Sequence, residues 1–225
     1  MCATGKPSSG GSTLLNGLQA YYAMENVNDS SGNGLTLTNN NSVTFAAGQV
    51  NNAAVFNNTS NQTLSHADNA AYQFGTSTDF SISIWFKLTT LAYNVLLMGY
   101  GAPQTGPTGW GFIWNSTFVR SSVGDGTHRA DKDTTTISDT NWHQMIATAS
   151  RVGNWTVYFD GSSIGSASMS AVGSVNSSLG LNFGTFISGW YNGLIDETGI
   201  WNRVLTGTEI TTLWNGGAGK TYPFT

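Results

Sequence analysis

Charged residues are scarce in this 225-residue chain. Asp, Glu, Lys and Arg together make up 9% of it, whereas they make up about 25% of a typical soluble protein. The formal net charge is -4, from 8 basic and 12 acidic residues. No cluster of Lys or Arg occurs that could neutralise a row of phosphates. We therefore expect no nucleic-acid partner.

Cysteine pairs and long apolar runs are also missing. Cys2 is the single cysteine, so the chain cannot form an internal disulfide. No segment approaches the ~20 consecutive apolar residues of a membrane-spanning helix, and no basic region followed by an apolar core marks a signal peptide. The sequence therefore predicts no membrane span. For Cys2 itself, a lipid anchor and a thiol in a flexible tail remain the two alternatives.

The chain is instead rich in glycine (28 residues), Asn, Ser and Thr, and 12% of it is aromatic. Gly and Asn supply positive φ in tight turns, while Ser and Thr tolerate extended backbone. This composition favours short strands joined by many turns over a helical bundle. Residues 1–13, dominated by Gly, Ser, Thr and Pro, predict a flexible N-terminal arm or linker, and residues 14–225 predict one domain.

Alternation of apolar and polar side chains indicates where the strands lie. In residues 80–87 every second side chain is large and apolar, which is typical of a strand that lines a core. Residues 155–160 alternate in the same way, and Asp160-Gly161 then supplies a hairpin turn. The other short runs are residues 17–24, 52–56, 93–98, 111–114 and 142–148. The pattern predicts an all-β fold in which two antiparallel sheets pack as a sandwich.

One segment near the C-terminus predicts a short helix. Thr206 and Glu209 have the spacing of a capping box, in which each side chain binds the backbone N–H of the other residue. Leu213 and its apolar neighbours follow on one helix face, and Gly216 or Gly217 is expected to end the helix. We expect this helix to be structural.

Three segments, in fixed order, resemble the laminin-G-like, concanavalin A-like jelly-roll family, in its bacterial and viral branch. They are residues 17–25 (GLQAYYAME) with 28–34 (NDSSGNG), residues 141–143 (NWH) with 155–161 (WTVYFDG), and residues 193–197 (GLIDE) with 200–205 and 209–210. The resemblance spans about residues 14–217. It implies a two-sheet jelly roll in which the first and last strands pair.

The resemblance also implies a structural calcium ion. The turn at residues 28–34 offers carboxylate and carbonyl oxygens, which are the hard ligands that Ca²⁺ prefers. The implied ligands are the side chains of Asp29 and Asp196, carbonyls of Asn28, Gly32 or Gly34, and Glu25 or Asn33 to complete the shell. From the residues alone, the alternative is a surface turn in which Asp29 binds its own backbone.

The acidic residues argue against a glycan-cleaving enzyme. Glucanases of related fold carry carboxylates that alternate on one strand, so that an acid and a nucleophile lie ~5 to 5.5 Å apart. This chain has no Glu-x-Asp-x-Glu run, and the adjacent Asp196 and Glu197 are expected to point to opposite faces of a strand. His66, His128 and His143 are scattered along the sequence. We predict no catalytic residue.

Aromatic residues in turn-rich segments are the candidates for sugar binding. A ring can stack on a pyranose face while Asn, Asp or Arg groups bind the hydroxyls. The predicted carbohydrate-binding residues are Trp110, Trp114, Arg129, Trp190 and Tyr191. For each ring, the alternative is ordinary packing beneath a loop.

Three functions follow from this pattern. The first is a non-catalytic, lectin-like module, stabilised by calcium, that binds a polysaccharide or a cell-surface glycan. The second is a phage or virion structural protein, in which the sandwich is an exposed adhesion knob and the N-terminal arm binds a virion or cell-surface protein. Both predict an extracellular or virion-surface location. The third, a polysaccharide-degrading enzyme, lacks its carboxylates.

Overall fold

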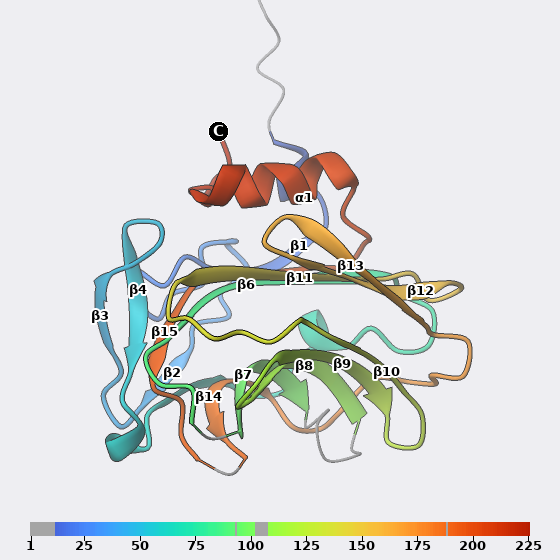
Figure 1. Ribbon diagram of the computed structural model, residues 1–225. Coiled ribbons are helices and arrows are strands. Elements are labelled where there is room, and N and C mark those ends of the chain that lie inside the picture. Colours follow the sequence, from blue (N-terminus) through green and yellow to red (C-terminus); the bar gives the residue numbers. More distant parts are fainter. Residues whose placement is uncertain (1–11, 93, 102–107, 188) are drawn as a thin grey trace, which may run out of the picture.

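The computed structural model describes residues 12–92, 94–101, 108–187 and 189–225. Two antiparallel sheets pack face to face, and a short helix, α1 (Gly207–Trp214), covers the outer face of the first sheet (Figure 1). This confirms the predicted all-β sandwich with a C-terminal helix. Most of the predicted arm, residues 1–11, lies outside the described residues.

The two sheets are built from fifteen strands in the part of the chain that is described. The first sheet has the order β13 (Ser162–Ser168), β12 (Asn154–Phe159), β11 (Trp142–Ala149), β6 (Phe80–Leu88), β15 (Gly193–Trp201), β4 (Asn52–Phe56) and β3 (Thr44–Ala47), with β1 (Leu18–Tyr22) also paired to β15. The second has the order β10 (Arg129–Asp133), β9 (Val119–Asp125), β8 (Thr108–Asn115), β7 (Asn94–Gly101), β14 (Leu181–Phe186), β5 (Thr63–His66) and β2 (Thr38–Asn40). Four short 3₁₀ turns are η1 (Thr13–Leu15), η2 (Asn58–Ser60), η3 (Ala70–Tyr72) and η4 (Asn215–Gly217).

The core forms where the two sheets face each other. In β6 the alternate residues Phe80, Ile82, Ile84 and Phe86 are all fully buried in it, as the sequence pattern predicted. Burying large apolar side chains of this kind contributes about 1.5–3 kcal/mol each relative to exposure. The first and last strands also pair as predicted, because Tyr22 of β1 lies opposite Thr198 of β15.

A second, smaller core lies between the first sheet and α1. The capping box of Thr206 and Glu209 starts the helix as predicted, and Leu213 packs into the smaller core. Trp214 stacks on Trp85, with ring centroids 5.1 Å apart. The helix ends at Asn215, which adopts the left-handed conformation one residue before the predicted glycines.

Both ends of the described chain lie on the helix side of the molecule. Thr13 is tied to the C-terminal region by a hydrogen bond from Arg203 Nη2 to its carbonyl oxygen, 2.8 Å long. Phe224 packs edge-on against Tyr21, with ring centroids 4.9 Å apart. Strands β9 and β10 belong to the other sheet and lie away from α1 (Figure 1). Among the described residues, no helix is long and apolar enough to cross a membrane.

Candidate functional site

Three of the predicted sugar-binding rings are buried, so that prediction was wrong for them. Trp110 and Trp114 are 0% exposed and Tyr191 is 1% exposed. The observed β8 extends beyond the predicted residues 111–114, and its alternation turns both tryptophans toward the core. The Tyr191 hydroxyl lies 2.8 Å from the carbonyl oxygen of Lys87. None of these rings can stack on a ligand at the surface.

Trp190 differs from these rings because it keeps part of its surface exposed. It lies between β14 and β15, in a segment without regular secondary structure. It stays a candidate on exposure alone.

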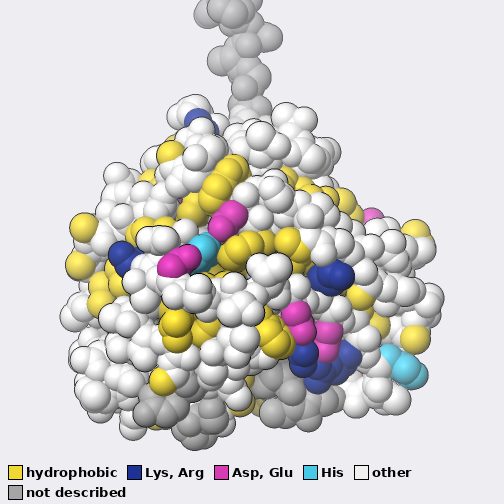
Figure 2. Space-filling model, viewed as in Figure 1, with side chains coloured by type: hydrophobic (Ala, Val, Ile, Leu, Met, Phe, Trp, Pro, Cys, Tyr) yellow, Lys and Arg dark blue, Asp and Glu magenta, His cyan; other side chains and the backbone are white. Residues whose placement is uncertain are grey.

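The fifth predicted residue, Arg129, belongs to a group on the outer face of the second sheet, in which the charged side chains are partly exposed and Ser122 is buried. We call this group the charged strip; it comprises Phe118, Arg120, Ser122, Arg129, Asp131 and Asp133. Alternate residues of β9 and β10 turn outward, because the intervening Val119, Val123 and Ala130 are buried in the core. Figure 2 shows acidic and basic side chains gathered over β9 and β10, beside hydrophobic ones.

Ion pairs fix the side chains of the charged strip. Arg120 forms two parallel hydrogen bonds with Asp133, from Nε to Oδ1 (2.8 Å) and from Nη2 to Oδ2 (2.9 Å). Asp131 accepts a hydrogen bond from the Ser122 hydroxyl (2.6 Å) and another from Arg129. The four charged side chains remain 26–36% exposed. Planar groups held in this way lose little conformational freedom when a ligand binds.

The ends of the charged strip are an aromatic ring and an arginine over a glycine. The Arg120 guanidinium carbon lies 5.7 Å from the centroid of the Phe118 ring, which places this half-buried ring on the same face. At the other end Arg129 pairs with Gly124, and the Arg129 side chain lies over that glycine. The strip thus combines a ring with alternating hydrogen-bond donors and acceptors.

Most of this group was missed from the sequence. Arg120 and Ser122 alternate on one strand, and Arg129, Asp131 and Asp133 alternate on the next. That period of two was a usable signal. The pairing that places Arg120 opposite Asp133 could not be predicted from the sequence, because it depends on the register of β9 against β10.

Asp196 and Glu197 are the second group of carboxylates, and the predicted opposite orientation was wrong. A β-bulge between Asp196 and Gly199 places Glu197 at φ +41°, so both carboxyl groups lie on the helix-covered face. Glu197 hydrogen-bonds to the hydroxyl of Tyr21 through Oε2, while its buried Oε1 has no partner. Burial raises the pKa of Asp196 to about 7 and that of Glu197 to about 8.

This acidic pair is unsuited to act on a glycan. Asp196 is 0% exposed and Glu197 is 3% exposed. Asp196 accepts hydrogen bonds from the backbone N–H groups of Gln49, Val50 and Glu197. Phe224, near the C-terminus, packs on the neighbouring Tyr21. The pair is therefore part of the interior, without access to a groove.

The two predicted side-chain ligands, Asp29 and Asp196, each accept hydrogen bonds from backbone N–H groups. The carboxylate of Asp29 accepts hydrogen bonds from the backbone N–H groups of Tyr21, Ser31 and Leu35 and from the Ser31 hydroxyl. The Asn33 side chain bonds to the carbonyl oxygen of Gln19 at 2.9 Å. These bonds agree with the alternative, a surface turn in which the Asp29 carboxylate binds backbone N–H groups.

The other predicted ligands either lie beside Asp196 or are exposed on the surface turn. Glu25 accepts from the Asn52 N–H at 3.3 Å, and its charge contributes to the raised pKa of Asp196, so these two acids are neighbours. Asn28, Gly32 and Gly34 are exposed. Within the described ranges, no group of three or more His, Cys, Asp or Glu could hold a metal ion. The calcium ion stays a prediction, in which Glu25 and Asp196 are neighbouring ligands.

His143 lies between two carboxylates and is fully engaged. Its Nδ1 is 2.8 Å from Asp160 Oδ2, and its Nε2 is 3.1 Å from Asp139 Oδ1. Burial alone would lower the pKa of His143, but the hydrogen bonds and charges of the two carboxylates outweigh burial and raise it. The ring also stacks on Phe159 at 5.0 Å. With both ring nitrogens occupied, His143 is not available as a general base.

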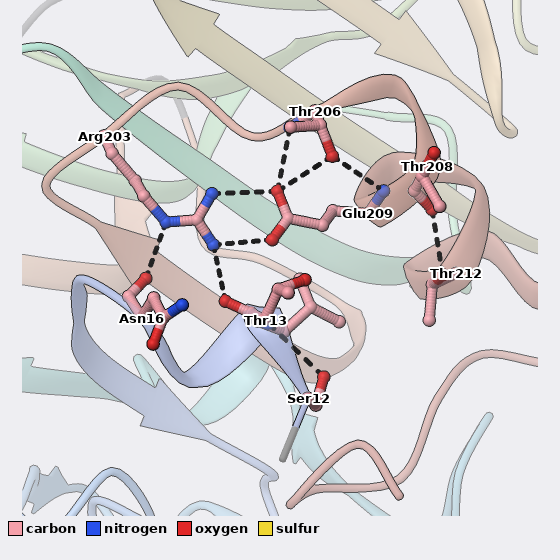
Figure 3. Close-up of a pocket in the computed structure, with 9 residues that line it drawn as sticks. Ser12, Thr13, Asn16, Arg203, Thr206, Thr208, Glu209 and Thr212 are labelled. Carbon is pink, nitrogen blue, oxygen red and sulfur yellow. Dashed lines mark hydrogen bonds and ion pairs between the residues drawn. The ribbon is translucent and has the colours of Figure 1, made fainter. Parts of the chain in front are cut away.

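A hollow of about 490 Å³ lies beside α1, where the described chain begins (Figure 3). Arg203 on its wall bonds to both carboxylate oxygens of Glu209 (2.7 and 2.8 Å) and to the carbonyl oxygens of Thr13, Asn16 and Val204. These five bonds use all five N–H groups of a guanidinium. The hydrogen bond from Arg203 also lowers the pKa of Glu209 to about 2. Arg203 therefore ties the start of the described chain to the start of α1. Its guanidinium has no N–H group left for a ligand in the hollow.

Comparison with known proteins gives one family and several similar folds. Residues 56–211 match the model of the concanavalin A-like lectin/glucanases superfamily. No curated protein matches the chain significantly. Among solved structures, the binding domain of Paraclostridial Mosquitocidal Protein 1 is 20% identical with a TM-score of 0.77, over 91% of this chain and 53% of that one.

Two further structures extend this comparison. The binding domain of botulinum neurotoxin serotype G is 20% identical with a TM-score of 0.74, over 88% of this chain and 50% of that one. Domain 4 of AbnA, an extracellular arabinanase of Geobacillus stearothermophilus solved with arabinotriose, is 20% identical with a TM-score of 0.67, over 90% of this chain and 98% of that one. The chain thus spans about half the length of the toxin domains and nearly all of the arabinanase domain.

Proposed function

The chain belongs to the concanavalin A-like lectin/glucanases superfamily, and from this premise we propose that it is a non-catalytic carbohydrate-binding module. The proposed site is the charged strip on β9 and β10. Its ligand is a polysaccharide or a cell-surface glycan.

The observation that carries this proposal is the preformed geometry of the charged strip. Sugar hydroxyls both donate and accept hydrogen bonds, and planar Arg and Asp side chains offer both functions. Arg120 and Asp133 are held in fixed orientations by their paired hydrogen bonds, and Phe118 supplies a ring beside them. The arabinanase domain that binds arabinotriose has the same fold over nearly its whole length, which supports a sugar as the ligand here.

A binding role fits the carboxylates better than a catalytic role does. Asp131 and Asp133 share the outer face of β10, a spacing of the kind that glucanases use. However, both oxygens of each are already hydrogen-bonded to Arg120, Arg129 or Ser122. The similar structures also carry the names of binding domains.

The position of the chain ends supports display on a surface. The described chain starts and ends on the helix side, whereas the charged strip faces away from α1 (Figure 1). A carrier attached at either end would therefore leave the strip free. We propose an extracellular or virion-surface location, and we retain a phage or virion adhesion knob as the second candidate. The predicted partner of residues 1–13 and the calcium ion are not part of this proposal.

The direct test is glycan binding by a strip variant and a charge-matched control. Arg120→Ala removes the central guanidinium, and we expect it to weaken binding by roughly tenfold or more, as a lost charged hydrogen-bonding group does. Lys220→Ala removes the same charge on the helix side, where the Lys220 ammonium bonds only to the carbonyl oxygen of Thr225 among the described contacts. It should bind like the wild type. Equal affinity of both variants would contradict the assignment of the site.

A further inference from the structure

We propose that the charged strip selects neutral, extended oligosaccharides and discriminates against sulfated or uronic-acid glycans. This inference rests on the proposed function and names the ligand class of the same site. It follows from the charge balance of the strip and from its length.

The charge of the strip is balanced at the level of individual side chains. Arg120 and Arg129 contribute +2, and Asp131 and Asp133 contribute -2, so the formal sum is zero. The balance is local, since Arg120 binds Asp133 in a two-point pair and also lies 3.8 Å from Asp131. A site for an anion presents guanidinium groups whose charge is not already neutralised.

An anionic sugar would be opposed at this surface in two ways. Its carboxylate or sulfate would lie beside Asp131 and Asp133, and like charges in close contact are unfavourable. To bind an arginine in a two-point manner it would have to displace the existing partner, such as Asp133 from Arg120. A neutral hydroxyl meets neither obstacle, because it can bind to the remaining donors and acceptors without breaking an ion pair.

The length of the strip indicates more than one sugar unit. Phe118, which immediately precedes β9, and Gly124 of β9 are six positions apart, which corresponds to about 20 Å at the rise of a strand. The aromatic ring lies at one end, and Arg129 covers Gly124 at the other. A single sugar ring cannot reach both ends. The strip therefore fits a chain of several units that lies along β9.

The first experiment compares neutral and anionic polysaccharides as probes, at low and high salt. Arabinan, xylan and a β-glucan are the neutral probes, and alginate and a sulfated galactan are the anionic ones. Calorimetry should show binding of at least one neutral probe, with an affinity that changes less than about twofold between about 50 and about 500 mM NaCl. Each anionic probe should bind at least about tenfold more weakly. Trimers should bind more tightly than the corresponding monosaccharides.

A second experiment changes the charge balance of the strip by a substitution that keeps the shape of the side chain. Asp133→Asn leaves the Arg120 charge less compensated, so we expect affinity for the sulfated galactan to rise at least about fivefold, in a salt-dependent manner. Asp68→Asn is the matched control; Asp68 is exposed near β5, toward the other end of the sheet. It should not gain this affinity.

The outcomes separate this inference from the function on which it rests. Tighter binding of an anionic probe than of every neutral one, lost at high salt, would overturn the neutral specificity while glycan binding stands. An equal gain in Asp133→Asn and Asp68→Asn would overturn the role of the strip in specificity. No binding of any probe would reject the proposed function and this inference together.

Discussion

The carboxylates on the outer faces of the two sheets differ in their exposure and in their hydrogen-bond partners. On the second sheet, Asp131 and Asp133 are partly exposed and hydrogen-bonded to arginines. On the first sheet, Asp196 and Glu197 are buried beneath the C-terminal elements, and the groups that shift their pKa values include no cation.

This difference matters because the chain has so few charges to place. Twelve acidic residues are distributed over 225 positions. An exposed, paired charge adds little to stability and remains available to a ligand. A buried carboxylate that bonds to backbone N–H groups instead holds loops in place, and it carries a desolvation cost. We therefore expect substitutions on the covered face to alter stability, and those on the open face to alter binding.

The largest expected effect is on the covered face. Asp196→Ala leaves the N–H groups of Gln49, Val50 and Glu197 without their acceptor inside the protein. Because each unsatisfied buried group costs about 1–3 kcal/mol, we expect the free energy of unfolding to fall by about 3 kcal/mol or more. Urea denaturation measures this change. Asp133→Ala, on the open face and 34% exposed, serves as the control, and equal losses in both variants would remove the contrast between the faces.

A smaller effect of opposite sign is expected from Glu197→Gln. The folded-state pKa of Glu197 is raised to about 8, so its contribution to stability is fully present below the unfolded pKa near 4.5 and declines as the pH rises toward 8. The amide cannot ionise, so the variant should be more stable than the wild type at pH 8 and similar to it at pH 4.5. Thermal unfolding across this range measures the difference. A pH-independent difference would show that ionisation of Glu197 is not its cause.

On the open face, Arg120→Ala should hardly change stability. Its ion pair is exposed, and such pairs contribute less than about 1 kcal/mol. Urea denaturation at neutral pH should therefore give a free energy of unfolding within about 1 kcal/mol of the wild type, although we expect glycan binding to weaken by roughly tenfold or more. A loss as large as that of Asp196→Ala would mean that the strip is structural.

The smallest expected effect is that of chelation. Asp29 bonds to its own turn, and Asp196 accepts hydrogen bonds from the N–H groups of Gln49 and Val50. A ligand that binds only the native state would raise Tm, so treatment with EDTA should change Tm by less than about 1 °C if none is bound. A fall of several degrees, restored by Ca²⁺, would show that Glu25 and Asp196 rearrange around an ion.

Features that depend on neighbouring residues were predictable from the sequence. The alternation in residues 80–87 gave both the strand and its buried face, and the spacing of Thr206 and Glu209 gave the helix start. In both cases the relevant geometry is the period of one element or the first turn of a helix. The pairing of the first and last strands came from family resemblance instead, because a contact between Tyr22 and Thr198 leaves no local pattern.

Features that depend on how strands meet were mispredicted. Trp110 and Trp114 lie in a turn-rich segment, which suggested exposure, yet the second sheet packs both rings into the core. Glu197 reaches the same face as Asp196 only because a bulge adds a residue to β15. The ion pairs of the charged strip require one register of β9 against β10. Bulges and registers are set by tertiary packing.

The bonds from Arg203 to Thr13 and Asn16 have a consequence for copies of this domain arrayed on one carrier. Because they fix the point where the chain enters the fold on the helix side, each copy attached there would keep its strip clear of the attachment point. Several strips could then engage one polymeric ligand at once, and such multivalency can strengthen attachment by about 10²–10⁴ over a single contact. Weak individual sites would then suffice for firm and reversible adhesion.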